Sequence, residues 1–427
     1  MNRSIAAVVL GTFTLRFSTG LTGGLLVYYL DQLPSFGGIQ VDSTTVGLLT
    51  AGYYLAELVL SPAFGFLSDR FGAHRIMQIG PIFGLVAVLI TAYVVDLGIL
   101  GFTRILEGGA AAASIPSILG YIALATSGNQ ALRGRAVARF EGATLAGIGL
   151  GIVAAGPMFD AIGRAGFLVN GGIYLLSFAI YRWGVAELHH EPTEDELASG
   201  THHVRPDRLD LARYRRILRS SGVWLLAPTW IALNAVIGSW TTQSVFQLVR
   251  TPPAQFHDQL LMQGFTPTSV SLGFGVIGLI FTAGLIYWGN RFKTQSRTTI
   301  ITIGVVGALV LLGATFGLNH SESLGLPVQA VLGLVAAGGL FVMAGATPAA
   351  LGLLADMTES HPADRGAIMG MYSVFLGVGQ ILGALLSGRA GDWAGIDGLL
   401  GVSVVLIIIA MLPLQRLRRS EHLIGAR

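Results

Sequence analysis

Residues 65–75 read Gly-Phe-Leu-Ser-Asp-Arg-Phe-Gly-Ala-His-Arg and place a short charged turn between two long apolar segments. Gly65 and Gly72 suit a sharp reversal, because glycine adopts backbone conformations that other residues avoid. Asp69, Arg70 and Arg75 supply the charges. The turn predicts two neighbouring helices whose ends meet here, and the composition of the chain decides what kind of helices they are.

The composition is that of a membrane protein. Of 427 residues, 52% are hydrophobic and 11% are charged, whereas a soluble domain carries roughly 25% charged residues. A bilayer core takes about 20 apolar residues per helix. Twelve such segments begin near Ile5, Thr44, Arg75, Ile99, Gly134, Ala165, Gly222, Thr268, Thr298, Leu326, Gly366 and Ile396. These segments are too long for barrel strands, so the sequence predicts an all-α membrane protein of twelve transmembrane helices.

Basic residues gather on alternate loops of this arrangement. All but six of the 26 Lys and Arg fall in the loops and tails of one side. The exceptions are three arginines on the opposite side and three within spans: Arg164, Arg250 and Arg389, and Arg16, Arg104 and Arg139. Because Lys-rich and Arg-rich loops stay in the cytoplasm, we expect a multi-pass protein of the cytoplasmic membrane with both termini inside. The basic pI reflects this belt, and no nucleic-acid partner is expected.

One long polar stretch divides the chain into halves. We expect an N-terminal six-helix bundle over residues 1–185, a cytoplasmic linker over 186–221 and a C-terminal six-helix bundle over 222–427. Within the linker, apolar residues recur at helical spacing among arginines, which predicts a basic amphipathic helix on the inner leaflet. These apolar residues are Leu211, Tyr214, Ile217 and Leu218.

An internal repeat supports the division into halves. A shift of 232 residues maps ten positions onto identical residues. Pro116, Gly120, Arg133, Gly134, Gly147, Gly151, Gly156, Asp160, Gly163 and Gly166 fall on Pro348, Gly352, Arg365, Gly366, Gly379, Gly383, Gly388, Asp392, Gly395 and Gly398. The charged turn has only an eroded second copy, Asn290-Arg291-Phe292. The sequence therefore predicts two pseudo-symmetric bundles, with the stronger charged turn in the first.

These features resemble the major facilitator superfamily over essentially the whole chain. Residues 65–72 fit the family's G-x-L-(A/S)-D-R-x-G turn, and residues 104–108 approximate its R-x-x-Q-G motif, with Glu107 in place of Gln. The family's antiporter motif ends G-x-x-x-G-P, and here the last spacing, from Gly151 to Gly156-Pro157, is one residue longer. The resemblance implies alternating access through a cleft between two bundles.

The resemblance also implies that the charged turn is a gate. Asp69 would accept hydrogen bonds from backbone N–H groups at a nearby helix N-terminus, where the helix dipole favours a carboxylate. The alternative is that Asp69, Arg70 and Arg75 only set the topology. Their spacing and the dipole argument favour the gating role, which says nothing about the substrate.

Ionisable residues within the spans are the candidate coupling and substrate groups, because a charge at bilayer depth is costly unless it is paired or faces water. Arg16 and Glu57 lie at similar depth in the first two spans. They could form a structural ion pair, or Arg16 could bind an anionic substrate while Glu57 exchanges protons. Intramembrane ionisable groups usually lie on a transport pathway, which favours function.

Arg104 and Glu107 are three residues apart and share one helical face. Glu107 could bind and release a proton if this pair opens during transport, or the pair could simply stabilise the helix. Glu141, in the fifth span, is a second candidate for protonation. The second half offers mainly neutral groups for a cavity, namely Asn234, Trp240, Gln243 and Gln380. We therefore expect an asymmetric cavity, with ionisable groups on the N-terminal side.

Other classes of function lack their signatures. The charged residues within the spans include no His, and the chain contains no Cys, so we expect neither an enzyme nor a cofactor. His189, His190, His202 and His203 lack the spacing of a metal site, and no phosphate-binding loop supports ATP-driven transport. A non-transporting membrane sensor would usually carry a sizeable soluble domain. We expect a monomeric secondary carrier that exports a small, largely hydrophobic compound in exchange for protons, with proton symport of an organic anion or sugar-like metabolite as the alternative.

Overall fold

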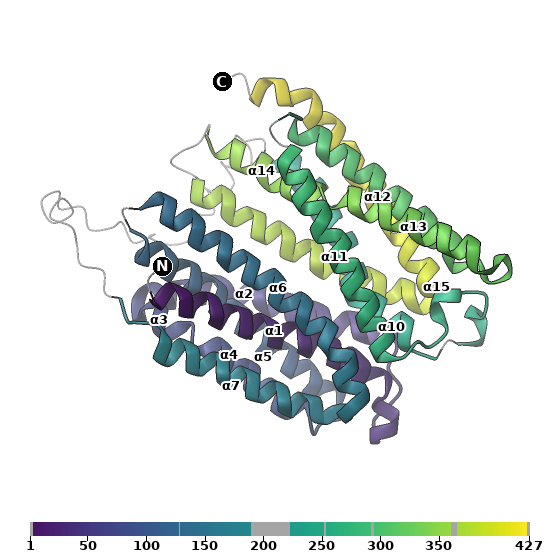
Figure 1. Ribbon diagram of the computed structural model, residues 1–427, viewed down its shortest axis with the longest axis horizontal. Helices are drawn as coiled ribbons and strands as arrows, with labels where there is room; N and C mark the ends of the chain where they lie inside the picture. Colours follow the sequence, from purple (N-terminus) through teal and green to yellow (C-terminus); the bar gives the residue numbers. More distant parts are fainter. Residues whose placement is uncertain are drawn as a thin grey trace, which may run out of the picture.

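The computed structural model describes residues 3–127, 129–188, 223–251, 253–291, 294–359 and 365–424, and these residues form helices and short connections without a strand. The helices run alongside one another (Figure 1). In chain order they are α1 (Arg3–Asp31), α2 (Ser43–Phe71), α3 (Ala73–Ile76), α4 (Ile79–Thr91), α5 (Leu97–Ala125), α6 (Gln130–Ile162), α7 (Gly166–Gly184), α10 (Val223–Val249), α11 (Pro267–Arg291), α12 (Arg297–Asn319), α13 (Gly325–Met343), α14 (Ala346–Glu359) and α15 (Arg365–Ile424).

Nine stretches of the described residues are long and apolar enough to cross a bilayer. Residues 132–184 contain both α6 and α7, and residues 373–415 contain both arms of α15, which is broken at Ala394 and Gly395. The 27-residue helix α10 adds another crossing. Helices and breaks begin within a few residues of the predicted starts, so the arrangement is consistent with twelve spans.

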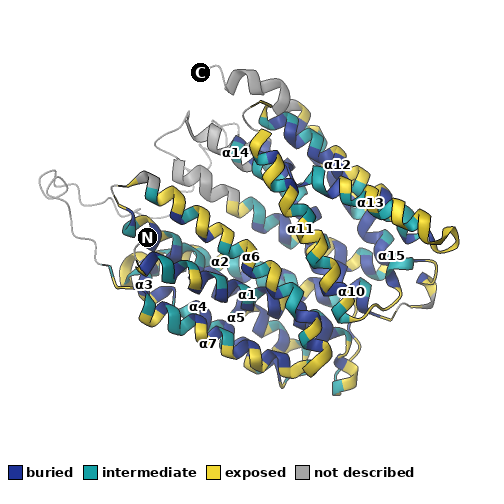
Figure 2. Cartoon of the chain, viewed as in Figure 1, coloured by how far each residue is buried: buried dark blue, intermediate teal, exposed yellow. Residues whose placement is uncertain are grey.

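Exposed residues are spread over the outer faces of the helices (Figure 2), and many of them are large apolar side chains, as on a lipid-facing surface. Trp393 is 81% exposed, Leu326 80% and Trp183 77%. In a soluble protein, burying such large apolar side chains would lower the free energy, so their exposure to water would be unfavourable. Exposed apolar side chains of this size, spread over so many helices, mark a surface solvated by acyl chains. Many polar and charged side chains are buried inside the bundle, and the candidate site lies among them.

The internal repeat predicted from sequence reappears in the backbone. Gly163 ends α6 with φ 55° and ψ −136°, and Gly395 breaks α15 with φ 59° and ψ −135°. A positive φ strains any residue with a Cβ, so glycine is needed at both turns. Residues 232 apart thus make the same turn in the two halves, which is the geometry that a duplicated bundle requires.

Buried apolar side chains form two clusters. One is drawn largely from residues before 186, and the other from residues after 222. The halves touch where α15 packs against α2 and where α11 packs against α6. Most of the linker lies outside the described residues, including the predicted amphipathic helix and the four histidines. Phe292, the last residue of the Asn290-Arg291-Phe292 copy in the second half, also lies outside them. The predicted domain boundaries stay a prediction.

The start of α5 is fixed by a side-chain cap, which gives a first testable expectation. The Asp96 carboxylate accepts a hydrogen bond of 2.9 Å from the Ile99 backbone N–H. Losing such a cap costs roughly 0.5–2 kcal/mol, so Asp96→Ala should destabilise the protein by about that much in detergent unfolding experiments. Asp96→Asn should stay close to the unchanged protein, because asparagine caps equally well. Equal loss in both variants would contradict the assignment.

Candidate functional site

Two close helix contacts assemble the candidate site in the N-terminal half. A Cβ on Gly147 would lie 2.9 Å from the Cβ of Arg16, so α6 rests directly on α1 at Arg16. A Cβ on Gly108 would lie 2.8 Å from the Cβ of Ala56 and 3.1 Å from the nitrogen of Glu57, so α5 rests directly on α2. Small residues permit such approach in membrane helices. Glycine therefore allows close contact within two pairs of charge-bearing helices, α1 with α6 and α2 with α5.

The charge of Arg16 acts on two carboxylates of other helices. Arg16 is 7% exposed, and the two carboxylates are those of Glu57 of α2 and Glu141 of α6. Among the described residues no ion pair closer than 4.0 Å joins Arg16 to either glutamate, so the predicted Arg16–Glu57 pair is not a closed salt bridge in this conformation. Arg16 is buried at bilayer depth and feels the charge of both glutamates. Protonation of either glutamate would therefore make the net charge around Arg16 more positive.

The second pair predicted from sequence is closed. The Arg104 guanidinium donates to the Glu107 carboxylate, and the side chains are 7% and 4% exposed. The Arg104 Nε atom is buried without a hydrogen-bond partner, so the pair is incompletely satisfied. Leaving one member of a buried pair alone is costly. If Glu107 takes up a proton, the buried charge of Arg104 loses its partner. This loss would favour a rearrangement that gives Arg104 a new partner or exposes it to water.

Two tyrosines complete the site, and sequence reasoning did not single them out. Tyr53 and Tyr54 stack edge-to-face with ring centres 5.1 Å apart. Tyr53 lies in the field of Arg16, Glu57 and Glu107, and the Tyr54 hydroxyl interacts with the Thr241 hydroxyl across the two halves. Both tyrosines precede Glu57 by one helical turn and share its face, a spacing that was present in the sequence.

The neutral residues predicted for the second half are dispersed. Asn234 donates to the Trp230 carbonyl at 2.8 Å, and Trp240 donates to Ser403 at 2.9 Å, both within that half. Gln380 is buried with its Oε1 atom unpartnered, beside Gly238. Gln243 donates to the Ser43 carbonyl at 2.8 Å and so lies where the halves meet, away from the charged cluster. Of the four, Gln243 and Gln380 each have a buried Oε1 atom without a hydrogen-bond partner.

The charged turn at residues 65–75 lies at the end of the bundle where α1 begins (Figure 1). Gly72 ends α2 with φ 91°. Arg70 lies over the Phe71 ring, 5.4 Å from its centre, and Arg75 pairs with Glu187 at 3.1 Å. Asp69 is exposed and has no hydrogen bond within the described part of the chain. The predicted contact of Asp69 with a helix N-terminus is thus not seen among the described residues, and it stays a prediction.

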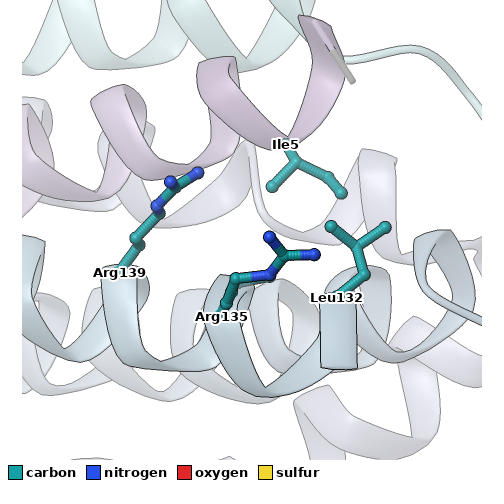
Figure 3. Close-up of a pocket in the computed structure, with 5 residues that line it drawn as sticks. Ile5, Leu132, Arg135 and Arg139 are labelled. Atoms are coloured by element: carbon teal, nitrogen blue, oxygen red, sulfur yellow. The ribbon is translucent and has the colours of Figure 1, made fainter. Parts of the chain in front are cut away.

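A cavity of about 140 Å³ lies between the first turns of α1 and α6, lined by Ile5, Leu132, Arg135, Ala136 and Arg139. Figure 3 shows the guanidinium groups of Arg135 and Arg139 reaching from α6 toward α1. The two arginines are four residues apart on one helical face. Sequence reasoning counted Arg135 only as a topological charge. Two arginines therefore line this cavity between α1 and α6.

Two curated relatives cover nearly the whole chain. The quinolone resistance protein NorA of Staphylococcus aureus (strain MRSA252) is 23% identical over 431 residues, 97% of each chain. The class B tetracycline resistance protein of Escherichia coli is 23% identical over 383 residues, 86% of this chain and 84% of its own. Identity at this level fits a shared fold.

A solved structure confirms the architecture. The nucleoside transporter NupG superimposes with a TM-score of 0.71 over 97% of this chain and 99% of its own, at 14% identity. The model of the Major Facilitator Superfamily matches residues 8–338. The family accounts for the bundle of apolar helices. The chain belongs to the Major Facilitator Superfamily and is a multi-pass membrane transporter, not an enzyme.

Proposed function

We propose that this transporter is a proton-coupled antiporter of the cytoplasmic membrane that exports a small, largely hydrophobic compound. The observation that carries the proposal is the cluster of charges in the N-terminal half. The charge of Arg16 acts on Glu57 and Glu141, and Arg104 is bound to Glu107. Three carboxylates with two arginines offer sites for protons at bilayer depth, where an ionisable group is otherwise disfavoured.

The same cluster argues against the import of an organic anion. An anion would need a free cation, but Arg104 is occupied by Glu107 and Arg16 faces two carboxylates. Glutamates outnumber arginines, so the site as a whole favours a neutral or cationic compound. Tyr53 and Tyr54 add aromatic surface, which suits a flat apolar molecule or a cation over a ring. Symport of an organic anion is the second candidate, motivated by Arg16.

The relatives support export. The names of NorA and of the class B tetracycline resistance protein record resistance to quinolones and to tetracycline. A transporter that confers resistance must lower the concentration of the compound inside the cell. The longer spacing between Gly151 and Gly156 departs from the antiporter motif, so export rests on the relatives and on the charged cluster.

The direction of proton movement tests the proposal. The protein is placed in liposomes loaded with a pH-sensitive dye, and a quinolone or a tetracycline is added outside. Antiport moves protons out as the compound enters, so the lumen should become more alkaline than in protein-free liposomes given the same compound. Acidification would establish symport and overturn the proposal. Uptake without any pH change beyond the protein-free control would exclude proton coupling.

A further inference from the structure

Two carboxylates that the proposed coupling site does not use join the halves of the molecule. Asp160, at the end of α6, accepts hydrogen bonds from the Thr268 backbone N–H at 2.9 Å and from the Thr268 hydroxyl at 2.5 Å. Asp392, in α15, accepts from the backbone N–H groups of Ser43 and Thr44 at 2.7 and 2.9 Å, and from the Thr44 hydroxyl at 2.5 Å. The two aspartates are 232 residues apart, the interval of the internal repeat.

Each aspartate binds the first turn of a helix in the opposite half. Thr268 begins α11 and Ser43 begins α2, and the first N–H groups of a helix have no partner within it. The helix dipole also makes this end positive, so a carboxylate is a strong partner. The contacts are thus charged, directional and dependent on the relative position of the two halves.

Neither helix needs the other half for its own cap. Asp42 already accepts from the Thr45 N–H at 2.7 Å at the start of α2. Likewise, the Thr266 hydroxyl accepts from the Ser269 N–H at 3.3 Å at the start of α11. Each helix therefore carries a local cap from its own half and a second carboxylate from the opposite half. The second contact contributes to the association of the halves rather than to helix formation.

A glycine four residues before each aspartate lets the backbones touch. A Cβ on Gly156 would collide with the Pro267 carbonyl of α11, and a Cβ on Gly388 would lie 2.9 Å from the Ser43 carbonyl of α2. These glycines are also 232 residues apart. The motif Gly-x-x-x-Asp thus occurs twice, with the glycine allowing contact and the aspartate binding the helix that is contacted.

The two contacts are unequal. At the Asp392 contact, Arg250 donates to the Ser43 hydroxyl at 2.9 Å and to the Gly391 carbonyl at 3.1 Å, and lies 3.9 Å from Asp392. Gln247 also donates to the Ser43 hydroxyl at 2.9 Å. At the Asp160 contact, Ser271 bonds to the Tyr28 hydroxyl at 2.8 Å and accepts from the Gly156 N–H at 2.9 Å. The Asp392 contact alone includes a second charged side chain, and Arg250 is one of only three arginines expected on this side.

We propose that Asp160 and Asp392 form a paired latch, which holds the end of the transporter opposite the charged turn closed in this conformation. Opening toward that side requires Asp160 to release the start of α11 and Asp392 to release the start of α2. Of the two contacts, that of Asp392 opposes opening more strongly than that of Asp160. At the other end, Asp69 forms no hydrogen bond with the described residues, which agrees with the opposite states that alternating access gives the two ends. The latch concerns conformation only and holds whatever the substrate is.

Distances between spin labels test the latch without any substrate. The chain has no cysteine, so Ser35→Cys and Glu322→Cys place single labels on the two halves at the latched end. Double electron–electron resonance on the full chain in nanodiscs then reports closed and open populations. Hydrogen bonds to charged groups are strong enough that losing one latch should raise the open-to-closed ratio roughly tenfold. We expect a larger rise for Asp392→Ala than for Asp160→Ala, and the largest for both together.

Asp42→Ala is the matched control, because it removes a carboxylate from the same end of α2 that bonds only within its own half. It should leave the distance distribution unchanged. Asp160→Asn and Asp392→Asn keep one acceptor oxygen and nearly the same shape, so they should fold and show smaller shifts in the same direction. An unchanged distribution in the double asparagine and double alanine variants would overturn the latch. So would a shift in Asp42→Ala as large as that in Asp392→Ala.

Discussion

Proton movement driven by substrate should be lost when Glu57 and Glu107 are both replaced by glutamine. Glutamine keeps the size and hydrogen bonding of the side chain but cannot exchange a proton at any accessible pH. Coupling free energies between two sites are typically about 1–3 kcal/mol, a change of roughly 5- to 150-fold in affinity. Substrate-driven alkalinisation of the liposome lumen should therefore fall by a factor in this range or below detection.

The two single variants separate the roles of the glutamates. Glu57→Gln removes a carboxylate that forms no closed ion pair, so the protein should remain stable while its coupling weakens. Glu107→Gln leaves Arg104 buried without its partner, which is expected to cost roughly 3–5 kcal/mol of stability. Glu107→Gln should therefore lower the unfolding temperature, and Glu57→Gln should not.

Exchange of labelled for unlabelled substrate distinguishes loss of coupling from loss of folding. Such exchange needs no net proton movement, so it should survive in Glu57→Gln and in any double variant that remains folded. Glu322→Gln, an exposed glutamate in the connection between α12 and α13, is the matched control and should behave as the unchanged protein. Full proton movement in the folded double variant would show that Glu57 and Glu107 do not couple transport.

The contact of α1 with α6 should tolerate no side chain at Gly151. A Cβ there would collide with the Phe17 carbonyl and lie 2.7 Å from the Leu21 nitrogen, both of which are backbone atoms that cannot rotate away. Overpacking a close contact typically lowers the free energy of unfolding by about 1–3 kcal/mol, and a clash with backbone atoms should cost an amount at the upper end of this range. Gly151→Val should therefore lower the free energy of unfolding in detergent by about this amount.

Gly149→Val separates packing from helix propensity. Gly149 lies in the same helix, two residues earlier, and nothing lies within 4 Å of where its Cβ would be. The two variants change helix propensity equally, so the difference between them measures the contact with α1. Equal unfolding temperatures for Gly149→Val and Gly151→Val would show that the close approach contributes nothing to stability.

Much of the candidate site was present in the sequence as single residues but not as an arrangement. Arg104 and Glu107 are neighbours on one helix, so their contact follows from the helical period alone. Arg16, Glu57 and Glu141 come from three helices, and no local rule says that they face one another. Tyr53 and Tyr54 were overlooked because an aromatic pair in an apolar helix has no signal of its own.

Gly156, Asp160, Gly388 and Asp392 illustrate the same limit. The repeat identified these positions from sequence, but identical residues at a fixed interval do not say what they touch. Their partners, Ser43 and Thr268, lie in the opposite halves, more than a hundred residues away. Gln243 was expected in the cavity and lies at this seam, because its depth along α10 depends on how the halves are docked.

The sequence by itself determined the class of fold, the succession of apolar helices, the duplication and the family, because hydrophobicity, helix length and short motifs are properties of the chain alone. Only the tertiary structure decided which charges meet and which end of the molecule is closed. Arg16 acts on Glu57 and Glu141 of other helices, and Asp392 binds the start of α2, because glycine allows particular helices to touch. Contacts between helices depend on the relative position of rigid bodies, which a local pattern does not encode. Whether Asp69 of the charged turn meets a partner depends on the same docking, and among the described residues it forms no hydrogen bond.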